Sequence, residues 1–168
     1  MDVAPLPRAG IGSVIGLLEI IDDAGGKDDV FKLARGLQME LDDILPVIDA
    51  GKLLELIEVK DGDVSLTQTG SSLLRSDVNG RKELLGTQLA KLKVFQQVMN
   101  VLKSKRNREV RRDYFVDLFE AKMSDDDAAS LLKTIIDWGR YAELIGYDRN
   151  EDVLYLPEEE SAPSQPTR

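Results

Sequence analysis

The 168-residue sequence contains no cysteine and no histidine, and it has only four Phe, four Tyr and one Trp. The missing cysteine excludes disulfide bonds, thiolate nucleophiles and Cys-ligated metal sites. The missing histidine removes the commonest general base and metal ligand. No apolar run approaches the ~20 residues that a membrane-spanning helix needs, and the first residues lack the pattern of a signal peptide. Composition therefore disfavours most enzyme classes, while 42% hydrophobic and 32% charged residues predict a folded globular chain.

The charged residues form three blocks within a net charge of −9. Residues 1–80 carry a net charge of −8, residues 81–112 a net charge of +8, and residues 113–168 a net charge of −9. The densest basic stretch is 103–112. It is either a solvated helix end and loop, or a docking patch for an acidic protein surface or an anionic lipid headgroup.

Apolar residues recur at helical spacing in three segments before any strand signal appears. Asp28 or Asp29 is placed to cap the second helix, and Pro46 lies inside the third. The three stripes consist of Val14, Leu17, Leu18 and Ile21, then Val30, Leu33, Ala34 and Leu37, then Leu41, Ile44, Leu45 and Ile48.

A β-hairpin is predicted directly after the third helix. Asp61-Gly62 stands between two alternating segments, which is the strongest local signal for a two-residue turn. In that register Lys60 faces Asp63, Val59 faces Val64 and Ile57 faces Leu66. Three helices followed by a hairpin predict a winged helix-turn-helix arrangement.

The second half repeats the first at an offset of 88 residues. Residues 48–57 and 136–145 are identical at six of ten positions, and Lys52 matches Arg140. Ser124 is placed to cap a further helix. The remaining predicted elements are one long helix carrying Leu85, Leu89, Leu92, Phe95, Met99 and Leu102, a helix around Tyr114, Phe115, Leu118 and Phe119, a helix with the stripe Ala128, Leu131, Leu132 and Ile135, and a second wing of Leu144-Ile145 and Val153-Leu154-Tyr155.

These patterns predict a mainly α fold with small β-hairpins (α+β), built as two tandem winged-helix-like modules. Residues 1–10 are expected to be a linker, 11–80 the first module, 81–156 the second, and 157–168 a disordered acidic tail. Neither terminal segment is expected to bury enough apolar surface to offset the entropy of ordering it.

DNA binding is disfavoured by the charges of both third helices. The first carries Asp42, Asp43 and Asp49, and the second carries Asp125–Asp127 and Asp137 against Lys133. Such helices would be repelled by phosphate, so we expect them to serve packing or protein contact. Dimerisation through residues 81–104 is compatible with any function.

The string Trp138-Gly139-Arg140-Tyr141 is either core packing at the join from helix to wing, with Gly139 as the helix C-cap, or an aromatic partner contact. The candidate partner-contact residues are Lys103, Lys105, Arg106, Arg108, Arg111, Arg112, Trp138, Arg140 and Tyr141.

No catalytic, metal-binding or cofactor-binding residues are predicted. A phosphate-binding Gly-rich loop is missing from the sequence. The nearest calcium-loop pattern starts at Asp148 and fails because Val153 stands where glycine is needed.

Four strings resemble the AAA-associated C-terminal domain of ABC importer ATP-binding subunits of the nitrate/sulfonate/taurine type. They are Val14–Glu19, Leu41–Pro46, Leu66–Gly70 and, most specifically, Ile136–Leu144. The resemblance covers about residues 11–156, whereas the Walker A, signature and Walker B segments of the full subunit are missing. The Pro-rich lead-in after Met1 is interpreted as a cut at the interdomain linker.

The resemblance implies a non-enzymatic accessory or regulatory domain, located in the cytoplasm beside an inner-membrane permease. Its partners would be the ATPase domain and the permease, and ATP hydrolysis would belong to another domain. Two alternatives stay open at this point: a winged-helix transcription regulator, and a small-ligand sensor with its pocket between the modules.

Overall fold

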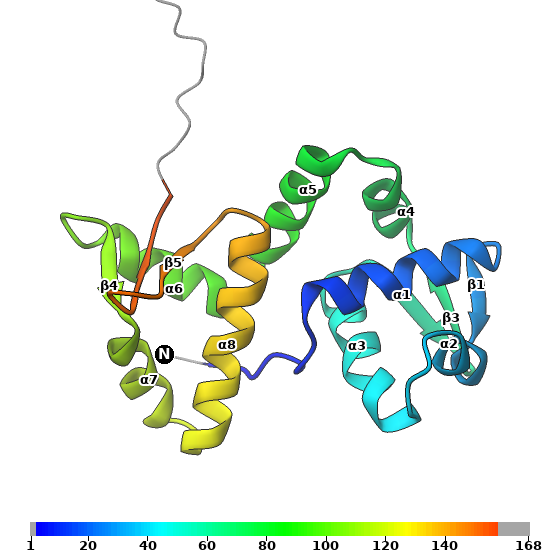
Figure 1. Cartoon of the computed structure of the whole chain (residues 1–168), viewed down its shortest axis with the longest axis horizontal. Coiled ribbons are helices and arrows are strands. Elements are labelled where there is room, and N and C mark those ends of the chain that lie inside the picture. Colours follow the sequence, from blue (N-terminus) through cyan, green and yellow to red (C-terminus); the bar gives the residue numbers. More distant parts are fainter. Residues whose placement is uncertain (1–2, 158–168) are drawn as a thin grey trace, which may run out of the picture.

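Two copies of one element order, helix–strand–helix–helix–hairpin, make up most of the computed structural model, which describes residues 3–157 (Figure 1). The first copy consists of α1 (Ile11–Asp23), β1 (Lys27–Asp29), α2 (Val30–Gly36), α3 (Leu41–Leu53), β2 (Ile57–Lys60) and β3 (Asp63–Leu66). The second consists of α6 (Lys93–Lys103), β4 (Glu109–Arg111), α7 (Arg112–Glu120), α8 (Asp125–Tyr141), β5 (Gly146–Asp148) and β6 (Val153–Tyr155).

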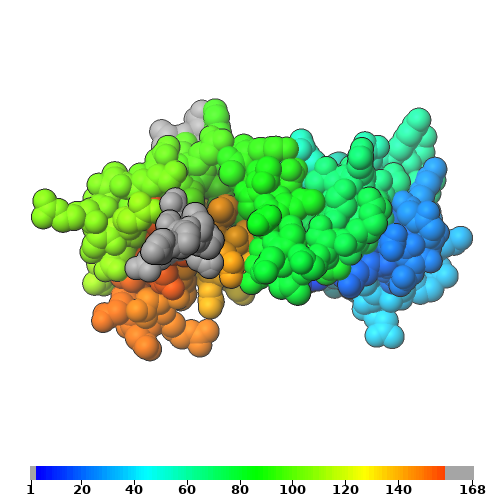
Figure 2. All heavy atoms as spheres, turned by 90° about the horizontal axis from the view of Figure 1, so that it is seen from above, coloured from blue at the N-terminus to red at the C-terminus, as the bar shows by residue number. Residues whose placement is uncertain are grey.

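The connecting helices α4 (Gln68–Arg75) and α5 (Val78–Ala90) lie between the two repeats, which occupy opposite ends of an elongated molecule (Figures 1 and 2). Mainly helical structure with small antiparallel sheets confirms the predicted fold class. No helix among the described residues has the length and apolar content required to cross a membrane.

Both sheets have three antiparallel strands in equivalent orders, β1-β3-β2 and β4-β6-β5. The predicted register of the first hairpin is confirmed, because Lys60 pairs with Asp63, Val59 with Val64 and Ile57 with Leu66. Its turn residues Asp61 and Gly62 have φ values of 52° and 83°, as a type I′ turn requires. Strands β1 and β4 were not predicted, because three residues are too few to show a period.

The second strand of the second wing is confirmed as β6, Val153–Tyr155, but the first strand was predicted two residues too early. Strand β5 begins at Gly146, because the backbone N–H groups of Leu144 and Ile145 both donate to the Gly139 carbonyl, at 2.9 and 3.3 Å. These residues close the end of α8 and are therefore not free to extend the sheet.

The predicted internal repeat is visible in the backbone hydrogen bonds. Leu56 N donates to Gly51 O at 2.9 Å, and 88 residues later Leu144 N donates to Gly139 O at 2.9 Å. Both bonds belong to the join from the third helix to the hairpin, where the sequence match is strongest.

Gly139 is not the C-cap of α8, so that prediction was wrong. The residue lies inside the helix, and the left-handed position is Glu143, with φ 59°. A Cβ on Gly139 would stand 3.1 Å from the Cβ of Ile145, and one on the equivalent Gly51 would stand 2.9 Å from Ile57 Cδ1. Both glycines therefore permit a close approach of the following strand segment.

The predicted single helix over residues 85–102 is instead divided into α5 and α6. Leu92 is extended (φ −82°, ψ 130°), and the Gln96 side chain donates to the Ala90 carbonyl at 2.9 Å at the break. The apolar spacing continues through the break, so the sequence period could not reveal it.

Helix α5, which precedes the break, contacts both halves of the molecule. Its Gln88 side chain donates to the Leu54 carbonyl of the first repeat at 2.9 Å, and its Lys82 pairs with Glu143 after α8 at 3.0 Å. The predicted module boundary between residues 80 and 81 falls inside this helix.

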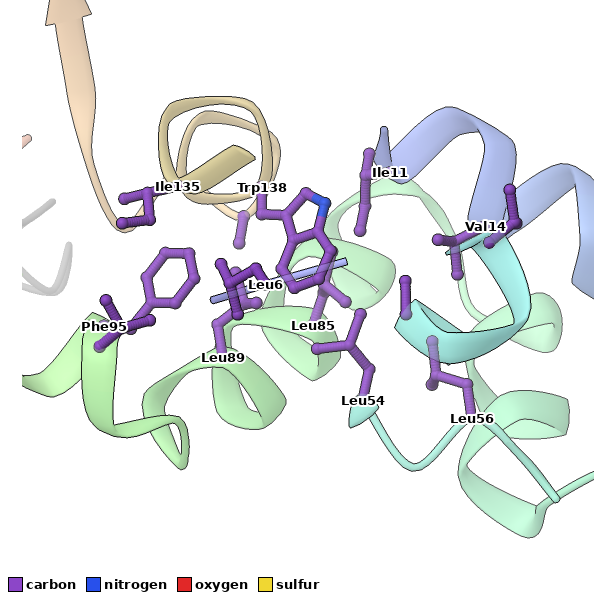
Figure 3. Close-up of a cluster of buried hydrophobic side chains, with 14 of the residues drawn as sticks. Leu6, Ile11, Val14, Leu54, Leu56, Leu85, Leu89, Phe95, Ile135 and Trp138 are labelled. Carbon is purple, nitrogen blue, oxygen red and sulfur yellow. The ribbon is translucent and has the colours of Figure 1, made fainter. Parts of the chain in front are cut away.

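One continuous hydrophobic core extends through both repeats (Figure 3). Trp138 is fully buried in it, together with residues of α1, α5 and the segment after α3. Apolar residues of the segment 81–104, through which dimerisation is considered possible, are buried here as well. They include Leu85, Leu89, Val94, Phe95, Val98 and Leu102.

The N-terminal segment is packed against α8, which corrects the expectation that residues 1–10 bury little surface. Leu6 is only 9% exposed, the Trp138 indole donates to the Ala9 carbonyl at 2.8 Å, and Ile11 N donates to the Asp137 carboxylate at 2.9 Å. The predicted tail, apart from its first residue Pro157, lies outside the described residues.

Candidate functional site

The basic stretch 103–112 covers the end of α6, the following loop, strand β4 and the start of α7. All six predicted cations of this stretch reach solvent, Arg112 only partly. Lys105 lies 5.9 Å from the centre of the Tyr114 ring, and Arg111 pairs with Asp113 at 3.7 Å. The loop projects from one end of the molecule (Figure 1).

This basic loop replaces a short glycine turn of the first repeat. Leu66 N donates to Gly26 O at 3.0 Å, and in the second repeat Leu156 N donates to Arg108 O at the same distance. Arg108 has a left-handed φ of 57°, as Gly26 does at 100°. The loop therefore carries its charges on a turn whose end is held by the sheet.

Two grooves border α8 and divide the predicted cations between them. The first, about 700 Å³, is lined by Lys103, Arg108 and Arg140. The second, about 930 Å³, is lined by Arg112 and again by Arg140. Lys105, Arg106 and Arg111 are exposed but line neither groove.

The second groove, here called the α8 groove, also contains three cations that the sequence reasoning missed as site residues. They are Arg8, Lys133 and Arg149, and the groove's carboxylates are Asp126 and Asp137. The signal that could have found Lys133 is the internal repeat, since the offset of 88 places it opposite Leu45 of the first repeat.

The acidic first turn of α8 adjoins this groove, since Asp126 lines it. Asp125, Asp126 and Asp127 form the first turn, where the helix dipole favours negative charge, and the Ser124 hydroxyl accepts from Asp127 N at 3.1 Å. Arg8 pairs with Asp127 at 2.8 Å and with Asp126 at 3.6 Å. The predicted acidic character of α8 is concentrated in this first turn, whereas Lys133 and Arg140 are exposed further along the helix beside Asp137.

Tyr147 and Asp152 form a polar pair beside the groove, with the Tyr147 hydroxyl donating to the carboxylate at 2.5 Å. This hydrogen bond is the main cause that raises the pKa of Tyr147, and burial and the negative charge of Asp152 add to it. The positive charges of Arg112 and Arg149 oppose the shift of that pKa, which places both guanidinium groups within electrostatic range of the hydroxyl.

The corresponding helix of the first repeat has a different surface. On α3, Leu41 and Leu45 are exposed by 37% and 44%, and Asp42 and Asp49 are exposed beside them. At the offset of 88 the two helices share an exposed carboxylate and an exposed cation, and they differ at Leu45, whose position Lys133 occupies in α8.

The aromatic string on α8 is mainly structural. Trp138 is fully buried, so its assignment as a partner contact is wrong and its alternative as a core residue holds. Tyr141 is half-buried against the core, and only Arg140 of this string is well exposed. Within residues 3–157 no three potential metal ligands gather in one place.

Fold and surface together define a two-repeat helical protein whose charged faces are open to binding. The family model of the C-terminal AAA-associated domain matches residues 31–148. The chain belongs to this family. Comparisons with curated proteins and with solved structures give no significant match.

Proposed function

We propose that this chain is a non-enzymatic accessory domain of an ABC importer ATP-binding subunit, of the nitrate/sulfonate/taurine type, and acts by protein contact. Its two repeats are winged-helix modules that bind protein in place of nucleic acid. The proposal rests on the family assignment and on the resemblance of Ile136–Leu144 to domains of these importers. Its location would be the cytoplasmic face of the inner membrane, through the transporter.

The exposed face of α3 is the observation that carries the proposal. Leu45 is 44% exposed, close to the exposed carboxylates of Asp42 and Asp49. A duplex-reading helix would meet phosphates at this position, and the carboxylates would be repelled. Exposed leucines flanked by charge instead suit a protein interface, where apolar anchors are surrounded by a polar rim.

The basic loop after α6 supplies a second contact of opposite charge. Lys103, Arg106 and Arg108 have no ion-pair partner among residues 3–157. These cations and the acidic α3 face at the other end of the molecule give the domain two contact surfaces of opposite charge. Contacts of this kind set the orientation and the association rate of a complex more than its affinity.

The test is chemical crosslinking of the full chain to an ABC importer's ATP-binding subunit and permease, read by mass spectrometry, together with the ATPase rate of the complex. Leu45→Lys should abolish crosslinks that involve α3. It should also remove any change in the ATPase rate that the unmodified chain causes. Val78→Lys is the matched control, because Val78 is 68% exposed on α5, away from α3.

Crosslinks and ATPase effects that survive Leu45→Lys would contradict α3 as the contact surface. No crosslinking at high protein concentration would contradict the accessory role itself.

A further inference from the structure

The α8 groove concentrates positive charge in a protein whose net charge is −9. Five cations and two carboxylates line its volume of about 930 Å³. One of these cations, Arg8, is already paired with the first turn of α8, at 2.8 Å from Asp127. The other four cations of the groove form no such pair among residues 3–157.

Those four cations have no ion-pair partner within the described part of the chain: Arg112, Lys133, Arg140 and Arg149. They come from three elements, the start of α7, the C-terminal half of α8, and the β5–β6 turn. Unpaired cations that converge on one concave surface attract anions strongly, because a cleft focuses the field of the charges that line it.

The backbone that carries these cations is fixed before any ligand arrives. Arg112 N donates to Asp152 O at 2.9 Å, which ties the start of α7 to the hairpin. The Asp148 carboxylate accepts from Asn150 N at 2.9 Å and from Glu151 N at 3.1 Å, which organises the turn that carries Arg149. Binding would therefore cost little ordering of the main chain.

The first repeat shows that the fold itself does not require these charges. Leu45 occupies the position of Lys133 at the offset of 88, and only Lys52 keeps the charge of Arg140. A structural role common to both repeats would leave the same residue types in both.

We propose that the α8 groove binds a small ligand with two or more phosphate groups, held by Arg112, Lys133, Arg140 and Arg149. Guanidinium groups suit this chemistry because they bind phosphate oxygens through two parallel hydrogen bonds, and lysine adds a point charge. Several cations in one groove match several linked phosphates better than a single anion. The carboxylates of Asp126 and Asp137 in the same groove disfavour a continuous nucleic-acid backbone.

The test is isothermal titration calorimetry of the full chain with inorganic triphosphate at low ionic strength. We expect saturable binding at one site, weakened at least about tenfold in the double variant Lys133→Ala/Arg140→Ala, since the variant removes two charge-assisted hydrogen-bond donors. Both side chains are exposed, so the variant should fold, which circular dichroism checks.

The matched control is Lys32→Ala/Lys52→Ala, which removes two exposed cations from the first repeat and changes the net charge equally. Unchanged affinity in this control supports the site. Equal weakening in both double variants, or no saturable binding, would overturn the proposal, because the attraction would then be non-specific or absent.

Two further titrations define the ligand class. Inorganic phosphate should bind at least about tenfold more weakly than triphosphate if several cations engage linked phosphates. Equal affinity for both would overturn the requirement for two phosphates. Binding of duplex DNA through Lys133 and Arg140, with no competition from triphosphate, would overturn the small-ligand proposal in favour of nucleic acid.

Discussion

Removing the Trp138 side chain should cost more stability than any other single truncation of an aromatic residue in this protein. The indole is fully buried where α8 meets the N-terminal segment and α5, and its Nε1–H donates to the Ala9 carbonyl at 2.8 Å (Figure 3). Truncation of a buried Trp to Ala costs about 3–5 kcal/mol through lost transfer energy and a residual cavity. The unpaired Ala9 carbonyl adds about 1–3 kcal/mol if water does not reach it.

Trp138→Ala should therefore lower the free energy of unfolding by about 4–8 kcal/mol, a large part of the roughly 5–15 kcal/mol typical of a domain. Trp138→Phe keeps most of the apolar contact and loses the donor, so we expect a loss of about 1–3 kcal/mol. Urea unfolding followed by far-UV circular dichroism measures both, since the substitution removes the only tryptophan as a fluorescent probe.

The control for this series is Phe31→Ala, because Phe31 is an aromatic residue that is 60% exposed. It should change the unfolding free energy by less than about 1 kcal/mol. If Trp138→Ala cost no more than Phe31→Ala, the inference that Trp138 joins the two repeats through one packed core would be refuted.

Three further predictions concern backbone packing, capping and pH. Gly70→Ala should be strongly destabilising, because its Cβ would stand 2.1 Å from a backbone carbonyl oxygen. Gly16→Ala should instead stabilise the protein by up to about 1 kcal/mol, because a Cβ there meets open space in α1. Equal melting temperatures of the two variants in thermal unfolding would contradict this reasoning. Asp137→Ala should cost about 0.5–2 kcal/mol, because this carboxylate caps the N-terminus of α1 from another helix; an unchanged urea midpoint would argue against that capping role. Hydrogen bonds from Lys91 and then Gln88 lower the pKa of Glu55 from its ordinary value of 4.5. These bonds therefore stabilise the folded state above pH 4.5, and their contribution is lost as the pH falls through the lowered pKa of the folded protein. Glu55→Gln should therefore be less stable than the parent at neutral pH and should converge with it in acid; a constant difference in urea titrations from pH 7 to about pH 3 would show that the charge of Glu55 is not involved.

The two repeats carry different charged surfaces, and each surface suits a different kind of binding partner. The apolar and acidic face of α3 and the cationic α8 groove lie in opposite halves of the molecule. They therefore support two separate proposals, one for protein contact and one for a phosphate ligand.

Local signals in the sequence determined the elements that depend only on neighbouring residues. The Asp61-Gly62 turn determined the register of the first hairpin, because that turn requires two left-handed residues and the alternation of apolar side chains permits one pairing. Helical spacing located α3, spacing and the Ser124 cap located α8, and Asp29 caps α2 as expected. The match of 48–57 with 136–145 revealed the repeat before any contact was known.

Tertiary structure decided the features that depend on distant partners. Strands β1 and β4 pair with the distant strands β3 and β6, and α5, which precedes the break before α6, contacts both repeats. The candidate site was likewise hidden, because a charge count along α8 cannot tell its first turn from its groove face. A sequence records which side chains are present on a helix, but only packing determines which of them share a surface.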